Sequence, residues 1–184
     1  MSNLRLAILG GALVLVACGS GANTGGGPAA GGEPTPAGSG ASGNETTDIT
    51  DFTLTDVDGN SVSLSQYVGK STIVISFWAT WCKPCVAEMP HLQKLFEAKK
   101  AMVLAISLDG PETEAEVAPF VKKKGFTFPV LIDSETRAAS LYNPRRAAPY
   151  TVIVDKHGKI VKRREGFNPG DEAQLEADVA SASQ

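Results

Sequence analysis

The sequence predicts an α/β fold, with a mixed central sheet flanked by helices and preceded by an N-terminal β-hairpin. After residue 48, buried strand patterns alternate with helical patterns, which requires parallel strands joined by crossover helices. The last two strand patterns are joined by a tight turn at Gly158, which makes that pair antiparallel. A turn signal at residues 58–60 separates two short alternating segments and predicts the leading hairpin.

Each element follows from its local pattern. Residues 72–78 form a continuous β-branched and aromatic run, typical of a strand buried on both faces. Residues 83–100 place their apolar side chains on one helical stripe, although Pro90 should kink this helix. A second helix is expected after a capping box at residues 113–116, but Pro119 conflicts with its continuity. The remaining strands are expected at residues 52–57, 61–64, 101–108, 129–132, 150–154 and 159–163, and the remaining helices at residues 135–141 and 171–180.

Composition excludes two classes of protein. The 184 residues contain 17 Lys and Arg against 20 Asp and Glu, so the chain is not a strongly basic nucleic-acid binder, and no nucleic-acid partner is expected. Three cysteines cannot form a disulfide framework. The length supports one domain of ordinary size with an appendage.

The first 17 residues predict a secretion signal. Arg5 supplies its positive end, and the run from Leu6 to Val16 contains only apolar residues and Gly. As a helix this run rises about 16 Å, which is too short to span a bilayer core of roughly 30 Å.

The end of this segment indicates a lipid anchor. The run closes with Leu15-Val16-Ala17-Cys18, which resembles the lipobox of bacterial lipoproteins. That resemblance implies cleavage before Cys18, lipidation of its thiol and attachment to a membrane. The alternative is a plain signal peptide with an incidental cysteine.

Residues 18–47 are interpreted as the lipidated cysteine and a Gly/Ala/Pro tether. Ten of the 19 glycines lie between Gly19 and Gly43, and no large apolar residue is present to offset the entropy of ordering. As a flexible coil, the segment has a root-mean-square reach of roughly 30 Å. The folded domain is therefore expected at residues 48–184.

Cys82 and Cys85 are the candidate chemical site. They lie three residues apart where a buried strand gives way to a helix, which puts both sulfurs on one side of the first turn. Cys82 comes first, and the positive end of the helix lowers a thiol pKa there. Cys85 continues the buried stripe, so we expect it to be shielded and to react second. Lys83 adds a nearby positive charge, and Pro84 is tolerated in the first helical turn.

Other uses of a CxxC pair fit the chain less well. A structural zinc site needs two more ligands, and the chain has no second CxxC and only His91 and His157. His91 is expected on the exposed side of its helix, and His157 in a solvated turn. A structural disulfide across four residues removes little loop entropy. We therefore expect redox chemistry, with no metal and no cofactor.

Residues 76–90 (SFWATWCKPCVAEMP) resemble the active-site strand and helix of the TlpA/ResA family of extracytoplasmic thiol-disulfide oxidoreductases. The resemblance extends from residues 51–54 to the Gly158 turn and ends near Gly166. It implies a thioredoxin-like fold whose dithiol exchanges disulfides with partner proteins outside the cytoplasm.

The resemblance also implies roles for single residues. Pro149 matches the cis-proline loop that faces the dithiol, so Ala148 and Tyr150 would line the site together with Trp81. Without the family, a simple strand-entry proline is the preferred interpretation of Pro149. Glu88 matches the acidic residue that follows the CxxC and influences thiol protonation; without the family, a solvated helix carboxylate explains Glu88 equally well. Ser76 departs from the Asp of cytoplasmic thioredoxins, which places the acid–base role on Glu88 or on water.

The expected function is a membrane-anchored protein-disulfide reductase of the bacterial cell envelope, with its domain facing the extracytoplasmic space. Its partners would be disulfide-bearing exported proteins, for example in cytochrome c maturation, and a membrane thiol electron donor. Two alternatives remain. A copper-binding module could use both cysteines with Met89 or His91. A peroxiredoxin-like antioxidant needs a Pro-x-x-x-Thr-x-x-Cys setting, and Pro is absent before Thr80.

Overall fold

The computed structural model describes residues 48–184. The predicted signal, Cys18 and tether lie outside the described residues. Within residues 48–184, no helix is long and apolar enough to cross a membrane.

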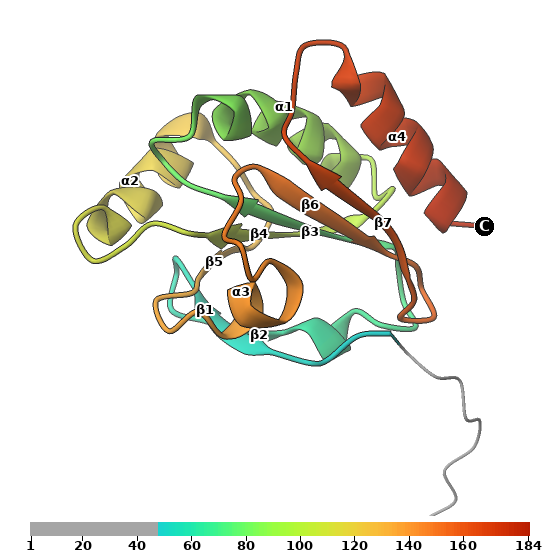
Figure 1. Ribbon diagram of the computed structural model, residues 1–184, viewed down its shortest axis with the longest axis horizontal. Coiled ribbons are helices and arrows are strands. Elements are labelled where there is room, and N and C mark those ends of the chain that lie inside the picture. The colour runs from blue at the N-terminus through green and yellow to red at the C-terminus, as the bar shows by residue number, and fades with distance from the viewer. Residues whose placement is uncertain (1–47) are drawn as a thin grey trace, which may run out of the picture. The chain divides into compact units, whose positions relative to one another are not determined.

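Seven strands form one mixed sheet in the order β2-β1-β5-β4-β3-β6-β7 (Figure 1). The strands β3, β4 and β5 are parallel, whereas β6 and β7 and the hairpin strands pair antiparallel. The α/β class and the N-terminal hairpin predicted from sequence are confirmed. The strands are β1 (Thr53–Asp56), β2 (Ser61–Ser63), β3 (Ile73–Trp78), β4 (Met102–Ser107), β5 (Val130–Ile132), β6 (Tyr150–Val154) and β7 (Ile160–Glu165).

Helices cover both faces of the sheet (Figure 1). Side chains of α1, α2 and α4 pack in one core cluster, and those of α3 pack in a second cluster on the opposite face. Alternate residues of β3 point into the two clusters, and all six are buried, as expected for a central strand. The helices are α1 (Lys83–Glu97), α2 (Glu114–Lys124), α3 (Arg137–Tyr142) and α4 (Asp171–Ala182), with a short 3-10 helix η1 (Leu64–Gln66) after the hairpin.

Several local predictions are wrong in detail. The capping box at residues 113–116 does not form, because the Thr113 side chain makes no capping hydrogen bond. Instead, the backbone N–H groups of Thr113 and Glu114 both donate to the Gly110 carbonyl. The α2 helix then continues through Pro119, and α1 continues through Pro90 but ends at Glu97, before the predicted residue 100. A proline inside a helix removes one N–H donor, and both helices continue past their proline without that hydrogen bond.

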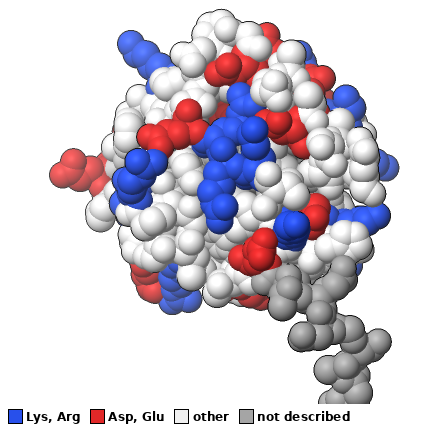
Figure 2. Space-filling view, turned by 45° about the vertical axis from the view of Figure 1, so that its right-hand side comes forward, with Lys and Arg blue, Asp and Glu red and all other residues white. Residues whose placement is uncertain are grey.

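Charged side chains of both signs are mixed over the face shown in Figure 2. The face in Figure 2 has a basic cluster near its centre with acidic side chains beside it. Two ion pairs join β7 to neighbouring segments: Arg164 contacts Asp178 of α4 at 2.9 Å, and Glu165 contacts Arg145 of the α3–β6 loop. The Arg164–Asp178 pair is largely covered, so it is less screened by solvent than an exposed pair.

Candidate active site

The two cysteines occupy the first turn of α1. Cys82 is the N-cap residue, and its Sγ accepts a hydrogen bond from the Cys85 N–H at 3.3 Å. The two residues form a disulfide with a Cα–Cα distance of 5.2 Å, within the usual range for such bonds. Pro84 lies within this first turn, where its missing N–H leaves no helical hydrogen bond unmade.

The oxidised pair is largely covered. Cys85 is fully buried, and Cys82 is only 5% exposed, so Cys82 is less accessible in the disulfide form than a freely exposed thiol. Trp81 is 63% exposed directly before Cys82, and Lys83 is exposed directly after it. A partner that reaches Cys82 must therefore contact this apolar and positive rim.

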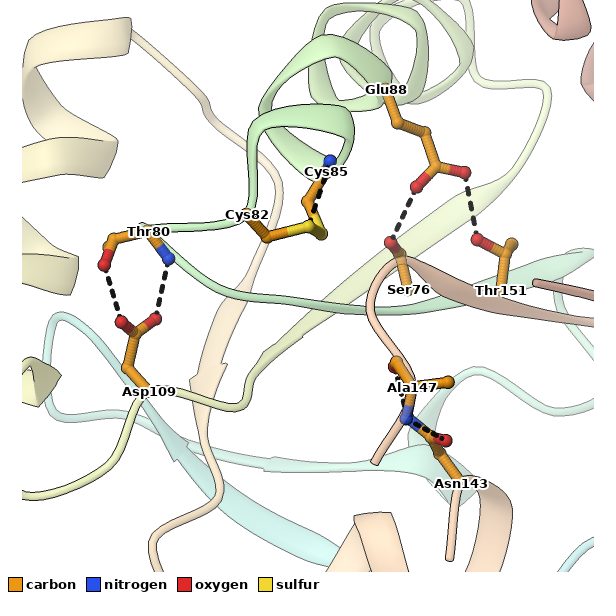
Figure 3. The surroundings of a disulfide bond; sticks show 9 residues. All are labelled: Ser76, Thr80, Cys82, Cys85, Glu88, Asp109, Asn143, Ala147 and Thr151. Carbon is orange, nitrogen blue, oxygen red and sulfur yellow. Dashed lines mark hydrogen bonds between the residues drawn. A yellow bond between two sulfur atoms is a disulfide. The ribbon is translucent and has the colours of Figure 1, made fainter. Parts of the chain in front are cut away.

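Glu88 is buried to one side of the disulfide rather than solvated, and its side chain points toward Ser76 and Thr151 (Figure 3). Its carboxylate accepts hydrogen bonds from the Thr151 hydroxyl at 3.0 Å and from the Ser76 hydroxyl at 3.4 Å. These two hydroxyls belong to adjacent strands, β6 and β3, and are direct partners in the strand register. Because Glu88 lies three residues after Cys85 on α1, both residues are on the same side of the helix.

Burial raises the pKa of the Glu88 carboxyl to about 7, from its usual 4.5. The hydrogen bonds from Thr151 and Ser76 and the positive charge of Arg164 oppose this rise, and Asp171 adds to it. A carboxyl that titrates near neutral pH can accept and return a proton under physiological conditions.

The segment before the cysteines is tied to the end of β4. Asp109 is 4% exposed and accepts hydrogen bonds from both the N–H and the hydroxyl of Thr80, at 2.9 and 2.6 Å. The hydroxyl of Ser107 donates to the same carboxylate at 2.8 Å. Asp109 thus fixes the chain two residues before Cys82. In the sequence, Asp109 directly follows the strand expected at residues 101–108, and this position is the signal that could have marked it.

A loop between α3 and β6 completes the site. The peptide bond between Ala148 and Pro149 is cis, and Ala148 packs against the cluster that contains both cysteines. Tyr150 pairs with Phe77 of β3, so Pro149 lies beside the end of the strand that leads to the dithiol. The resemblance to the TlpA/ResA family implies that this loop helps to seat the substrate, and this role stays a prediction.

Two further residues were not anticipated as site residues, and one expectation fails. Asn143 holds the backbone of Ala147, and Thr151 contacts Glu88 across 63 positions in the sequence. His91 is half-buried rather than exposed, and its ring packs 5.6 Å from that of Phe167. Within residues 48–184, no three His, Cys, Asp or Glu side chains gather as a metal site.

A disulfide at the first turn of a helix, a neighbouring proline loop and a mixed sheet define a thioredoxin-like dithiol protein. Comparison with known proteins gives the same class. Residues 46–163 match the AhpC/TSA family, so the chain belongs to that family.

Named relatives refine the resemblance to ResA. The chain is 39% identical over 113 residues to thiol-disulfide oxidoreductase ResA of Bacillus cereus, covering 61% of this chain and 64% of that protein. It is 38% identical over 116 residues to ResA of Halalkalibacterium halodurans, covering 62% and 65%. The match thus spans just under two thirds of these relatives' own length.

Solved structures confirm the thioredoxin-like fold. The exposed lipoprotein thioredoxin of Streptococcus pneumoniae is 30% identical with a TM-score of 0.59, covering 70% of this chain and 99% of that chain. A thiol:disulfide interchange protein of the thioredoxin family from Chlorobium tepidum has a TM-score of 0.64 at 22% identity, covering 74% and 95%, and shows the fold alone.

Replacement of Glu88 by Gln should remove a pH dependence of stability. A carboxyl with a raised folded pKa binds more protons when folded, so its contribution to the free energy of unfolding falls as pH rises from 4.5 to about 7. The variant has no such loss. The free energy of unfolding of the variant minus that of the oxidised parent protein should therefore increase by about 2–3 kcal/mol between about pH 5 and about pH 8.

Urea unfolding of the oxidised proteins at both pH values measures this difference. Glu176→Gln, which changes an exposed carboxylate on α4, is the matched control and should stay parallel to the parent protein. If Glu88→Gln also stays parallel, Glu88 does not titrate in this range.

Proposed function

We propose that this protein is a lipid-anchored thiol-disulfide oxidoreductase that reduces disulfides of exported partner proteins in the bacterial cell envelope. The observation that carries the proposal is the Cys82–Cys85 disulfide at the first turn of α1, with a buried carboxyl beside it. The ResA relatives are named as thiol-disulfide oxidoreductases, which supports the same chemistry for this chain.

The reaction begins with the reduced dithiol. The Cys82 thiolate attacks one sulfur of the partner disulfide, which forms a bond between Cys82 and the partner and releases the other partner sulfur as a thiolate that takes up a proton. The Cys85 thiolate then attacks the Sγ of Cys82, forming the internal disulfide and releasing the second partner thiol. Two electrons pass from the dithiol to the partner.

The positions of the two sulfurs support this order. Cys82 lies at the helix N-terminus, where unpaired N–H groups and the helix dipole favour a thiolate. Cys85 is fully buried, so it must lose its proton within the protein before it can attack. Glu88 is the acceptor in this proposal, because its pKa of about 7 makes proton transfer at neutral pH reversible.

Recharging the site requires an electron donor outside the cytosol, and a membrane thiol protein is the class that fits. An exported partner awaiting free cysteines, such as a cytochrome c apoprotein, would be a suitable substrate. The exposed lipoprotein relative supports the placement at a membrane surface, where Cys18 would carry the lipid. Several acyl chains are needed for stable anchoring, since one chain binds only marginally.

Cys85→Ala protein should trap its partner on Cys82. Without the resolving thiol, the mixed disulfide persists and appears as a covalent adduct on a non-reducing gel or by mass spectrometry after incubation with a disulfide substrate. The reciprocal Cys82→Ala variant retains the buried Cys85 and should give little adduct. Equal or greater trapping by Cys82→Ala would reverse the roles of attacker and resolver.

Replacement of Cys18 by Ser should release the protein from the membrane. Expressed in a bacterium with labelled fatty acid, the parent protein should carry label and sediment with membranes, because the Cys18 thiol is the acceptor. Cys82→Ser is the control and should remain labelled. A Cys18→Ser protein that keeps its label and stays membrane-bound would contradict the anchor.

One alternative has a specific observation in its favour. Peroxiredoxins share this fold, and the chain belongs to the AhpC/TSA family. Two features count against this role: the residue four positions before Thr80 is Ser76, where the peroxiredoxin pattern needs Pro, and the Ser76 hydroxyl donates a hydrogen bond to Glu88. Peroxide consumption by the reduced protein faster than its reduction of a peptide disulfide would favour that role.

A further inference from the structure

A row of three polar side chains crosses the sheet on the face that carries Glu88. The register places Ser76 of β3 opposite Thr151 of β6, and Thr151 opposite Arg164 of β7. Directly opposite residues of antiparallel neighbours point to the same face of a sheet, with Cβ atoms about 5 Å apart. Arg164 therefore lies on the Glu88 face, one strand beyond the threonine that donates to the Glu88 carboxylate.

The helix α4 holds Arg164 on this face. The Arg164 Nη1 donates to Oδ2 of Asp178 at 2.9 Å, and only 15% and 10% of the two side chains are exposed. The other carboxylate oxygen of Asp178 accepts from the Gln174 amide at 2.8 Å. Burial alone would raise the pKa of Asp178, but these hydrogen bonds and the charge of Lys162 hold it below its usual value. Asp178 is therefore ionised at neutral pH, and it fixes the guanidinium in place.

The charges that act on the Glu88 carboxyl come from β7 and α4. Of the other elements that pack against α1, β3 and β6 present hydroxyl groups to Glu88, and β4 presents apolar side chains. Asp171, the half-buried first residue of α4, disfavours a second negative charge, whereas Arg164 favours it. On α1 itself, Cys85 and His91 lie three residues before and after Glu88. Arg164 thus opposes the effects of burial and of Asp171 on Glu88.

We propose that Arg164 is a positioning residue for proton transfer from Cys85 to Glu88. Held by Asp178, its guanidinium favours the ionised carboxyl, which is the form that accepts a proton. The proton passes from the Cys85 Sγ to a carboxylate oxygen, and the resulting thiolate displaces the partner sulfur from Cys82. The inference rests on the proposed disulfide exchange and adds to it the residue that sets the pH range of its second step.

Titration of Glu88 measures this effect without a substrate. The oxidised full chain, with its glutamate carboxyl carbons labelled with carbon-13, is titrated by NMR, and the Glu88 signal is identified by its loss in Glu88→Gln. The parent protein should show a midpoint at about pH 7. In Arg164→Gln the midpoint should rise by roughly one pH unit, at the low end for a nearby opposite charge because Asp178 neutralises part of it. Arg164→Lys keeps a positive charge, so its midpoint should stay nearer to that of the parent.

Arg163 supplies the matched control. It is exposed and precedes Arg164 on β7, and its register partner Val152 packs in the core cluster on the other face of the sheet. Arg163→Gln removes the same charge from the same strand, so it should leave the Glu88 midpoint unchanged. Thermal midpoints measured in parallel report any general loss of structure, which a lysine at position 164 would not selectively repair.

The pH dependence of disulfide exchange connects the titration to the reaction. The reduced full chain reacts in single turnover with a synthetic peptide that has an internal disulfide, and formation of the Cys82–Cys85 bond is followed by acid quenching and alkylation. A midpoint one unit higher lowers the ionised fraction of Glu88 at pH 7 about fivefold. The rate for Arg164→Gln should therefore fall about fivefold at pH 7 and approach the parent rate at pH 9, and Arg163→Gln should match the parent at both.

The titration alone can overturn the inference. An unchanged Glu88 midpoint in Arg164→Gln, an equal shift in Arg163→Gln, or an equal shift in Arg164→Lys would each do so. A shifted midpoint with a parental rate at pH 7 would also contradict it, because the charge would then act on a carboxyl that the reaction does not use. Disulfide reduction by the parent protein would still stand in all of these cases. A parent protein that does not reduce the peptide would contradict the proposed function itself, and the role of Arg164 in proton transfer with it.

Discussion

The antiparallel pairing of β3 with β6 is the constraint on which the site depends. Its register places Ser76 opposite Thr151, and the hydroxyls of both residues donate hydrogen bonds from the sheet to the Glu88 carboxylate of α1. The adjacent pair, Phe77 and Tyr150, brings the proline loop to the end of β3 that continues to the cysteines. A slip of one residue would turn Thr151 to the opposite face and separate the carboxyl from its donor. The same backbone ladder therefore sets the positions of both the Glu88 carboxyl and the proline loop.

The two sulfurs lie in unlike electrostatic surroundings. The N-terminus of α1 favours negative charge on Cys82, whereas burial and the nearby Glu88 disfavour a second anion at Cys85. In the proposed reaction, this difference would let Cys82 attack first, while Cys85 would keep its proton until the mixed disulfide has formed. It also limits stabilisation of the reduced form, because only one sulfur has a favourable site for charge. Strong oxidants of this fold depend on such stabilisation, so the arrangement favours a reductant.

Local patterns predicted the strands, the helices and the CxxC because each is encoded within a few neighbouring residues. The burial of Glu88 was not predictable from its helix, since a polar residue there has the same local pattern whether it faces solvent or Thr151 on a strand 63 residues later. Asn143 and Asp109 act through loops whose shape depends on the assembled sheet. The capping box predicted at Thr113 matches the local motif but does not form. The backbone N–H groups of Thr113 and Glu114 donate to the Gly110 carbonyl instead.

In the proposed function, this dithiol donates electrons to its partners. The reduction potential of the Cys82–Cys85 couple, measured by equilibration of the full chain with glutathione and dithiothreitol buffers, tests that direction. The buried carboxyl and the shielded Cys85 predict a potential near that of thioredoxin, about −270 mV. A potential near that of DsbA, about −120 mV, would mean that the reduced form is strongly stabilised, and would contradict a reducing role.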